Sequence, residues 1–482
     1  MRACLALMAC ALLAHALPTS LAPVGDAASL PKWVPFYVYE FPELDIEHLC
    51  EPEVIEEWRS FKHGDDMLFA DHARGRHPWR VSDPEEARLF VVPAPLAFYQ
   101  RNGKCKGKST KDILRSLLEK LSQTKSWQRY QGADHVFSGS DWAVRFFAND
   151  VIRALVKNSI LGHIENFDNA HWRCTVITPY SGSVWSHMTR ALLFDALEMN
   201  LHQYACGDDD QRNCTMELER LWPTPEQAWG RPWSERPYMF FLKGQIDARA
   251  GYRQRRLSCE ALRDVPGPHV CVSVSDPGKS TYERACPDNV FAALAWATNH
   301  TGTYSNWSDP VVPGSKSEEH LESGTTPDPL ETWSQERCRS GHSAFAYLYQ
   351  LAASKFCLMI RGDTLSSNRL YDCIRYNSIP IIISDGIERD GLPFYSRVPW
   401  HEFSFFVKEA QQPEQLTKAF VDIMATPPEK LEAMRQSMAD HMPDVLWNMA
   451  GSRVFENFLL EAADRCLDNL ETFASASDKE QA

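Results

Sequence analysis

Two serines and an arginine follow a glycine turn near residue 362, between a strand-like and a helix-like stretch. Residues 356–360 (FCLMI) form a continuous apolar run, which is typical of a strand buried on both faces of a parallel sheet. After the turn, Ser366 or Ser367 begins a helix. A helix N-terminus carries unsatisfied N–H groups and the positive end of the helix dipole, so this arrangement predicts an anion site.

Two arginines flank the same turn and strengthen that prediction. Arg361 precedes the turn and Arg369 stands in the first turn of the helix, and a guanidinium can bind a phosphate through two parallel hydrogen bonds. The motif is neither a Walker loop nor G-x-G-x-x-G, so it indicates a phosphate or carboxylate site. The candidate residues are Arg361, Gly362, Asp363, Ser366, Ser367, Asn368 and Arg369. A purely structural interpretation stays open, in which Ser366 only caps the helix, Arg369 pairs with Asp372 and Asp363 is a turn residue.

Strands and helices must alternate to position this site, and the first half of the chain predicts such an alternation. The expected strands are 35–40, 88–93, 134–137 and 175–178, and the expected helices are 52–62, 111–125, 142–156 and 184–200. This order is typical of an α/β fold with a parallel, doubly wound sheet.

The alternation restarts after a polar, proline-containing stretch at 207–236, where we place a domain boundary. The expected strands are 237–243, 270–274, 356–360, 379–384 and 403–407, and the expected helices are 249–263, 343–355, 367–376, 413–425, 428–441 and 453–468. The sequence thus predicts an N-terminal domain over 33–220 and a C-terminal domain over 236–410. Helices follow over 411–470 and a disordered tail over 471–482.

Length and charge exclude several classes of protein. A chain of 482 residues suggests two or three domains. The net charge of −14, from 50 basic and 64 acidic residues, excludes a nucleic-acid binder that works through bulk positive charge. A hydrophobic fraction of 44% and a charged fraction of 24% exclude a largely disordered chain, a collagen or a coiled coil.

The N-terminus and the cysteines predict an oxidising compartment. Residues 1–22 hold one early arginine, an apolar run and small residues, which favours a signal peptide over a short signal anchor on the membrane. Two of the 14 cysteines lie in that segment, so 14 − 2 = 12 remain for disulfides. Cys357 and Cys373 fall inside apolar strand and helix patterns, which favours buried free thiols. Sequons predict glycan sites at Asn213, Asn299 and Asn306.

The stretch that begins at Phe356 and contains the predicted anion site resembles the exostosin family of glycosyltransferases, glycosyltransferase family 47. It carries the family's motifs in order: Phe356-Cys357-Leu358, Gly362-Asp363-Thr364, Ser366-Ser367-Asn368-Arg369-Leu370-Tyr371-Asp372, Ile379-Pro380-Ile381, Ile387-Glu388, Leu392-Pro393-Phe394, Trp400 and Phe403-Ser404. Upstream motifs match at 37–42, 83–87, 89–93, 134–137 and 236–244, so the resemblance runs over about 33–409. Arg389-Asp390-Gly391 interrupts the family pattern, and the chain is identified as a divergent member.

The resemblance implies a GT-B architecture, in which two Rossmann-like domains face a cleft and the C-terminal domain binds a nucleoside-diphosphate sugar. It also implies a hexosyl-, pentosyl- or glucuronosyltransferase that moves a sugar, with inversion, from a UDP sugar to a glycan or glycoprotein hydroxyl. The anion-site residues then bind the diphosphate. Glu388 is expected on a donor sugar or ribose hydroxyl, and Lys243 and Arg253 near the leaving group, although Arg253 fits a solvated helix face equally well.

Such a reaction needs a base that deprotonates the acceptor, expected from the N-terminal domain. Asp141 is the first candidate because it follows the strand 134–137, although it fits a helix N-cap as well. His135 and Asp168 are further candidates. Three tryptophans are candidates for stacking on sugar rings: Trp142, Trp172 and Trp185.

No cofactor and no essential metal are expected. Asp208-Asp209-Asp210 matches the D-x-D that binds a metal–nucleotide in GT-A enzymes, but it lies in a polar loop between Cys206 and Cys214 with no strand before it. A solvated loop is the favoured interpretation.

Two other functions stay open from the sequence. One is a non-catalytic, glycan-binding subunit of a glycosyltransferase complex, and the other is a sulfotransferase, which the missing N-terminal P-loop disfavours. The expected partners are a nucleotide sugar and a glycan or glycoprotein acceptor, without nucleic acid. The expected compartment is the lumen of the Golgi or the endoplasmic reticulum. Assembly into a homo- or hetero-oligomer and anchoring through the N-terminus stay open.

Overall fold

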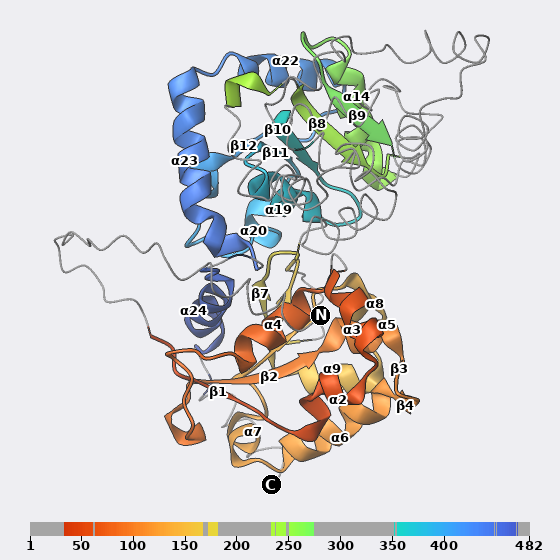
Figure 1. Ribbon diagram of the computed structural model, residues 1–482, viewed down its shortest axis with the longest axis vertical. Coiled ribbons are helices and arrows are strands. Elements are labelled where there is room, and N and C mark those ends of the chain that lie inside the picture. The colour runs from red at the N-terminus through yellow and green to blue at the C-terminus, as the bar shows by residue number, and fades with distance from the viewer. Residues whose placement is uncertain are drawn as a thin grey trace, which may run out of the picture. The chain divides into compact units, whose positions relative to one another are not determined.

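Five parallel strands form the sheet of the first half (Figure 1). The computed structural model describes residues 33–60, 63–166, 172–181, 233–236, 238–246, 250–273, 351, 354–447, 449, 451–468 and 470. The strands are β1 (Phe36–Val38), β2 (Leu89–Pro95), β5 (His135–Ser138), β6 (Ile160–His163) and β7 (Cys174–Ile177), which lie side by side in that order. All their pairings are parallel, as the alternation of strands and helices predicts.

Strand β2 shows why the strands of this sheet have continuous apolar sequences. Leu89 and Val91 pack into one core cluster, whereas Phe90 and Val92 pack into another on the opposite face. All seven residues of β2 are buried. Helices cover both faces of the sheet, and this burial is what a parallel sheet requires.

The helices of the first half are mostly short. They are α2 (Ile46–Leu49), α3 (Pro52–Ser60), α4 (Asp65–Arg74), α5 (Leu96–Asn102), α6 (Thr110–Ser122), α7 (Lys125–Tyr130), α8 (Trp142–Phe147) and α9 (Asp150–Val156), with 3-10 turns η1 (Pro42–Leu44) and η2 (Pro84–Glu86) and a small ribbon of β3 (Lys104–Cys105) and β4 (Lys108–Ser109). The predicted single helix over 142–156 is wrong. Asn149 interrupts it by accepting bonds from the backbone N–H groups of Val151 and Ile152, both at 3.0 Å, and so caps α9.

A second sheet of five parallel strands forms the other half. Its strands are β8 (Tyr238–Gly244), β9 (Val270–Ser273), β10 (Ser354–Ile360), β11 (Ile379–Ile383) and β12 (Phe405–Phe406), in the spatial order β12-β11-β10-β8-β9. The order reverses between β8 and β10, so the connections leave these two strands in opposite directions. In doubly wound sheets, ligands bind beyond the carboxyl ends of the strands at this switch point. The predicted α/β fold class is confirmed.

The remaining helices are η3 (Trp233–Glu235), η4 (Ala250–Tyr252), α14 (Arg253–Leu262), α19 (Asn368–Arg375), α20 (Ile387–Asp390), α21 (Trp400–Phe403), α22 (Pro413–Met424), α23 (Pro428–Val445) and α24 (Val454–Cys466). In Figure 1, α22 and α23 flank the second sheet. Helix α22 packs on α14, and α23 packs on α19, α21 and β11.

The last helix, α24, packs against the first sheet although it follows the second sheet in the sequence. Helix α24 packs on β7, β6 and α4 of the first sheet. Phe455 and Phe458 make edge-on ring contacts with Phe69 of α4, at 5.3 and 5.1 Å between centroids. A disulfide joins Cys174 on β7 to Cys466 at the end of α24. The segment predicted as 411–470 is therefore divided between the two sheets.

Four disulfides occur among the described residues: Cys50–Cys105, Cys174–Cys466, Cys259–Cys271 and Cys357–Cys373. The expectation that Cys357 and Cys373 are free thiols is wrong. The first lies on β10 and the second on α19, and these two elements pack against each other. The apolar surroundings are as expected, but packing brings the two sulfurs together.

Residues 34–482 form one unit and residues 1–33 another. The signal segment 1–22, the sequons at Asn213, Asn299 and Asn306, and the tail all lie outside the described residues. No helix within the described ranges is both long and apolar enough to cross a membrane.

Candidate functional site

A cavity of about 680 Å³ is lined by residues of both halves. The first half contributes His63, Trp142, Arg145, Phe146, Phe147, His163, Ile164 and Tyr180. The second half contributes Gln245, Tyr252, Arg255, Gly362, Asp363, Thr364, Ser366, Ser367, Asn368 and Arg369. The volume falls in the range of roughly 300–1,000 Å³ that small-molecule sites occupy. Six of the seven residues predicted for the anion site line this cavity.

Arg369 is held at the switch point of the second sheet. Its Nε donates to the carbonyl oxygen of Lys243 at 3.1 Å, and its Nη2 donates to the same oxygen. Lys243 and Gly244 end β8, so the guanidinium bridges α19 to the carboxyl end of that strand. Arg369 is 6% exposed, and its Nη1 has no hydrogen-bond partner among the described residues. It forms no salt bridge with Asp372, contrary to the structural interpretation.

The backbone beside Arg369 supplies further donors. Ser367 caps α19, since its side chain accepts from the backbone N–H of Arg369 at 3.4 Å. Ser366 and Asn368 line the cavity on either side of this cap. The N-terminus of α19 thus opens into the cavity with the positive end of its dipole, next to a buried guanidinium. The arrangement suits an anion such as a phosphate.

Asp363 is braced rather than left in a free turn. The hydroxyl of Tyr252 donates to its Oδ2 at 2.9 Å. Arg255 packs its guanidinium over the Tyr252 ring at 4.6 Å and donates to the carbonyl oxygens of Gln245 (2.9 Å) and Ile360 (3.2 Å). These contacts fix the loop between β10 and α19 against the N-terminal part of α14.

Four residues predicted for the donor lie outside the cavity lining: Lys243, Arg361, Arg253 and Glu388. Arg361 pairs with Glu409 at 3.3 Å. Arg253 donates to the carbonyl oxygens of Ala410 and Gln411 and so ties α14 to the chain before α22. Glu388 accepts from the Tyr395 hydroxyl at 2.7 Å and contacts His401 Nε2 at 2.8 Å, in an exposed cluster.

Lys243 is a buried lysine, 4% exposed. Burial lowers the pKa of Lys243 to about 8. Burying an ammonium group is costly, and an anion bound nearby would reduce that cost. The side chain itself does not line the cavity.

Asp141, the first candidate for the base, caps a helix and pairs with an arginine. It caps α8 by accepting from the backbone N–H of Ala143 at 2.6 Å. Both of its oxygens also pair with Arg101, at 2.9 and 3.0 Å. These contacts occupy both oxygens, and Asp141 does not line the cavity. Its Oδ2 lies 3.9 Å from Nε2 of His63, which does line the cavity.

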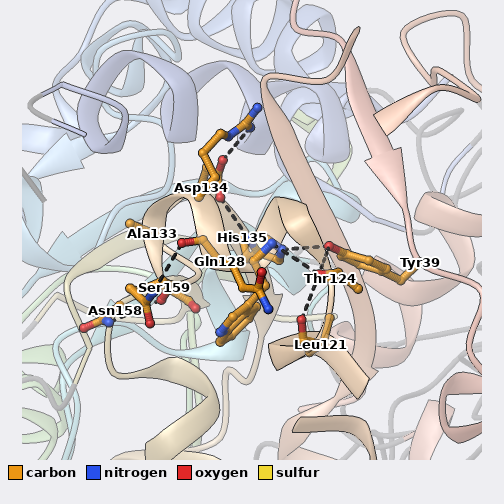
Figure 2. A network of polar contacts seen from close by, with 12 residues as sticks. Tyr39, Leu121, Thr124, Gln128, Ala133, Asp134, His135, Asn158 and Ser159 are labelled. Atoms are coloured by element: carbon orange, nitrogen blue, oxygen red, sulfur yellow. Dashed lines mark hydrogen bonds and ion pairs between the residues drawn. The ribbon is translucent and has the colours of Figure 1, made fainter. Parts of the chain in front are cut away.

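His135 lies in a separate buried network (Figure 2). Its Nδ1 contacts Asp134 at 2.8 Å and its Nε2 contacts the Tyr39 hydroxyl at 2.9 Å. Tyr39 in turn contacts Thr124, and Arg129 pairs with Asp134. Burial lowers the pKa of His135. This network joins the residue after β1 to β5 and α7 and contributes no residue to the cavity lining. Asp168 lies outside the described residues.

Glu165 connects the two halves directly. Its Oε1 accepts from the backbone N–H of Ser366 at 3.1 Å, and Glu165 is only 3% exposed. Burial raises the pKa of Glu165 to about 7. Next to it, the backbone N–H of Asn166 donates to the carbonyl oxygen of Asp390 at 2.8 Å. The segment after β6 therefore supports the loop that precedes α19.

Several cavity residues escape sequence reasoning. Arg255 belongs to the same basic run as Arg253. Side chains two positions apart on a helix point to nearly opposite sides, so the way α14 packs decides which arginine reaches the site. Gly244 does not line the cavity but adjoins Arg369, and only the structure reveals its role, because a Cβ there would overlap the Arg369 guanidinium. His63, Arg145 and Tyr180 carry no local motif.

The three tryptophans predicted to stack on sugar rings lie in different places. Trp142 lines the cavity and is 40% exposed. Trp172 is buried, and its indole N–H donates to Thr175 at 2.7 Å, so it belongs to the core. Trp185 and the aspartates 208–210 lie outside the described residues. Among the described residues, no group of three or more His, Cys, Asp or Glu side chains could hold a metal ion.

Comparisons with known proteins identify the family of the chain. The model of the exostosin GT47 domain matches residues 32–184 and 315–421. A segment of 55 residues is 47% identical to the probable arabinosyltransferase ARAD1 of Arabidopsis thaliana, covering 11% of this chain and 12% of that relative. The crystal structure of the GtfA/B complex is a distant structural match, with a TM-score of 0.28 and 10% identity over 75% of this chain and 63% of that one. By the match of the family model, the chain belongs to the exostosin GT47 family.

Proposed function

We propose that the protein transfers a sugar from a nucleoside-diphosphate sugar, with UDP as the expected nucleotide, to a hydroxyl of a glycan or glycoprotein. The observation that carries the proposal is the buried guanidinium of Arg369 at the N-terminus of α19, inside a cavity lined by both halves. Family membership supports the same class of reaction. The local similarity to a probable arabinosyltransferase also supports sugar transfer.

The diphosphate of the donor is placed at the N-terminus of α19. When the bond between the sugar and the phosphate breaks, negative charge grows on the departing phosphate. Arg369 and the N–H groups at the start of α19 stabilise that charge, and they are fixed in place before the reaction begins. Arg255 lines the same cavity and adds positive charge.

The acceptor must lose a proton on the side opposite the diphosphate. Among the described cavity residues of the first half, only His63, His163 and Tyr180 can accept one. Burial lowers the pKa of His163 to about 4 and raises that of Tyr180 well above its ordinary value. His63 is therefore the proposed base, with Asp141 behind it at 3.9 Å. One base and one departing phosphate on opposite sides support direct displacement with inversion of the anomeric carbon.

The chemistry above uses only side chains and backbone of this chain, and we propose that no essential metal takes part. The four disulfides support an oxidising lumen of the secretory pathway as the place of action. Anchoring through the N-terminal segment and assembly with a second chain stay proposals.

A thermal-shift screen tests the donor site. The chain from residue 33 onward is mixed with UDP, with UDP sugars and with 3′-phosphoadenosine phosphosulfate. A ligand at 100 times its Kd stabilises the folded state by about 2.7 kcal/mol. We expect a UDP sugar to raise the melting temperature, Arg369→Ala to abolish the rise and Arg361→Ala to retain it, because Arg361 is paired with Glu409 outside the cavity.

The other outcomes separate the alternative functions. A rise with the phosphosulfate donor alone would identify a sulfotransferase. A rise with a UDP sugar, but no donor hydrolysis or transfer to any glycan, would identify a non-catalytic subunit. Loss of transfer in EDTA would contradict the metal-free mechanism.

A further inference from the structure

Helix α8 exposes an unusual number of aromatic rings. Trp142, Phe146 and Phe147 are 40%, 57% and 59% exposed. They are three of the six large hydrophobic side chains that are exposed within the described ranges, and they lie on one helix of six residues. We call these three rings the aromatic platform. All three line the cavity.

The rings of the platform contact one another. Trp142 and Phe147 meet nearly edge-on, with centroids 5.4 Å apart. Phe146 lies 6.5 Å from Trp142 and 6.4 Å from Phe147. Two guanidinium groups pack against rings of the platform: Arg101 is 4.9 Å from the Trp142 ring centre and Arg145 is 4.5 Å from the Phe146 ring centre. The platform is therefore a continuous apolar surface edged by positive charge.

The backbone under the platform is firmly held. Asp141 caps α8 and pairs with Arg101, while Ala143 and Val144 face inward and are buried. At its C-terminal end, the carbonyl oxygen of Phe147 accepts from Gln100 at 2.8 Å. The helix could not turn its rings into the core without breaking these contacts. Burial of an aromatic ring stabilises a folded protein, so three exposed rings forgo stability and suggest an occupant.

The location of the platform selects the occupant. It belongs to the same cavity as Arg369 and Ser367, but it comes from the opposite half of the chain. A sugar ring has an apolar face of C–H groups, which packs on an aromatic ring, and a rim of hydroxyl groups, which accept hydrogen bonds from guanidinium groups. A nucleotide at α19 leaves the first-half side of the cavity for a second ligand.

We propose that the aromatic platform is the acceptor subsite, which binds a sugar unit of a glycan chain by stacking. The proposal rests on the proposed function, since it places the acceptor opposite the donor. A sugar stacked there presents a hydroxyl toward His63, which lines the same cavity. Arg145 holds the rim of the stacked sugar, and Phe146 and Phe147 extend the contact to a neighbouring unit.

Direct binding and transfer are both measured to test the subsite. Saturation-transfer NMR is recorded on the chain from residue 33 onward with cellohexaose, xylohexaose, galactohexaose and arabinohexaose. We expect at least one to bind the wild type. Trp142→Ala and the double variant Phe146→Ala, Phe147→Ala should each weaken that binding at least tenfold, and Trp142→Phe should restore part of it. Trp33→Ala is the matched control, because Trp33 is 56% exposed but does not line the cavity.

The readouts separate this proposal from the function on which it rests. In the platform variants, the thermal shift caused by the UDP sugar should stay at the wild-type value, while the KM for the glycan rises. If the wild type binds none of the four glycans, or if the variants bind as well as the wild type, the subsite is wrong even when the UDP sugar binds. If no nucleotide sugar shifts the wild type, the proposed function fails instead.

Two other occupants give distinct results, and either would overturn the subsite. A second copy of the chain would appear as a dimer in analytical ultracentrifugation that Trp142→Ala dissociates. A lipid surface would appear as binding to phosphatidylcholine vesicles that the platform variants lose.

Discussion

Gly244 lies directly against the guanidinium of Arg369, so that a Cβ at position 244 would overlap Nη2. The glycine is the last residue of β8, and the arginine belongs to the first turn of α19, 125 residues further along the chain. This close approach allows Arg369 to reach the carbonyl oxygen of Lys243, while Nη1 has no hydrogen-bond partner among the described residues. Only a residue without a side chain fits between the strand and the guanidinium.

Gly244→Ala should therefore displace Arg369 and weaken nucleotide-sugar binding. The backbone of Gly244 does not require a positive φ, so alanine is compatible with the strand. We expect at least a tenfold rise in the Kd for the UDP sugar by calorimetry, close to the effect of Arg369→Ala. Gly75→Ala is the control, since Gly75 also has ordinary φ and lies far from the site. Unchanged affinity in Gly244→Ala would show that Arg369 does not hold the diphosphate.

His63→Asn should reduce turnover without changing donor binding. A general base contributes about 10²–10⁴-fold to rate, and asparagine retains a polar side chain but cannot take the proton. We expect kcat to fall at least a hundredfold while the thermal shift with the UDP sugar is retained. The acidic limb of the kcat profile against pH should also disappear in the variant. A variant that keeps both its turnover and its acidic limb would exclude His63 as the base.

The sequence predicts most of the cavity residues in the loop before α19 because the determinants there are local. An apolar strand, a glycine turn and a serine cap lie within about 15 residues, and each acts on its neighbours. Arg361 and Arg253 were misassigned because their partners are remote: Glu409 follows Arg361 by 48 residues, and Ala410 follows Arg253 by 157. Which side of α14 faces the cavity depends on docking, which local patterns do not contain.

The same limit applies to the acceptor side. His63, Trp142 and Tyr180 stand in separate segments, and the folding of the first sheet brings them into one cavity. The interruption between α8 and α9 also depends on a single cap, Asn149, inside an otherwise helical pattern. The family resemblance helps most in the loop before α19, where its motifs are dense.

The disulfide between Cys174 and Cys466 should contribute to stability by holding α24 on the first sheet. Non-reducing peptide mapping should recover these two cysteines in one linked pair of peptides. Disulfides typically stabilise by about 2–4 kcal/mol, so Cys466→Ser paired with Cys174→Ser should lower the melting temperature. Phe458→Ala offers a comparison, because it weakens the same packing and keeps the disulfide. Recovery of either cysteine as a free thiol would contradict the pairing.

Lys243 should couple nucleotide binding to proton uptake. Burial lowers the pKa of Lys243 to about 8, so at pH 8.5 more than half of the free protein carries a neutral amine. A diphosphate bound nearby favours the ammonium and raises that pKa, and the site then takes up a proton. Calorimetry of UDP binding in two buffers with different ionisation enthalpies should show uptake at pH 8.5 and little at pH 6.5. Lys243→Met should abolish it, whereas equal uptake in that variant would place the titrating group elsewhere.

Glu165 should make the stability of the protein fall between pH 5 and pH 8. Burial raises the pKa of Glu165 to about 7 from an unfolded value near 4.5. The folded state therefore holds the proton more tightly than the unfolded state. The stability that this provides is fully present below about pH 4.5 and is lost as the pH rises through about 7. With 1.36 kcal/mol for each pKa unit, the loss is at most about 3 kcal/mol.

Glu165→Gln removes this titration and keeps an oxygen that accepts from the Ser366 backbone N–H. In urea unfolding at pH 5 and pH 8, we expect the variant to gain stability relative to the wild type as the pH rises. Glu429→Gln, an exposed change on α23, is the matched control for the loss of one negative charge. If the free energies of unfolding of Glu165→Gln and the wild type change in parallel with pH, the carboxyl does not titrate in this range. The loop before α19 would then be insensitive to its charge.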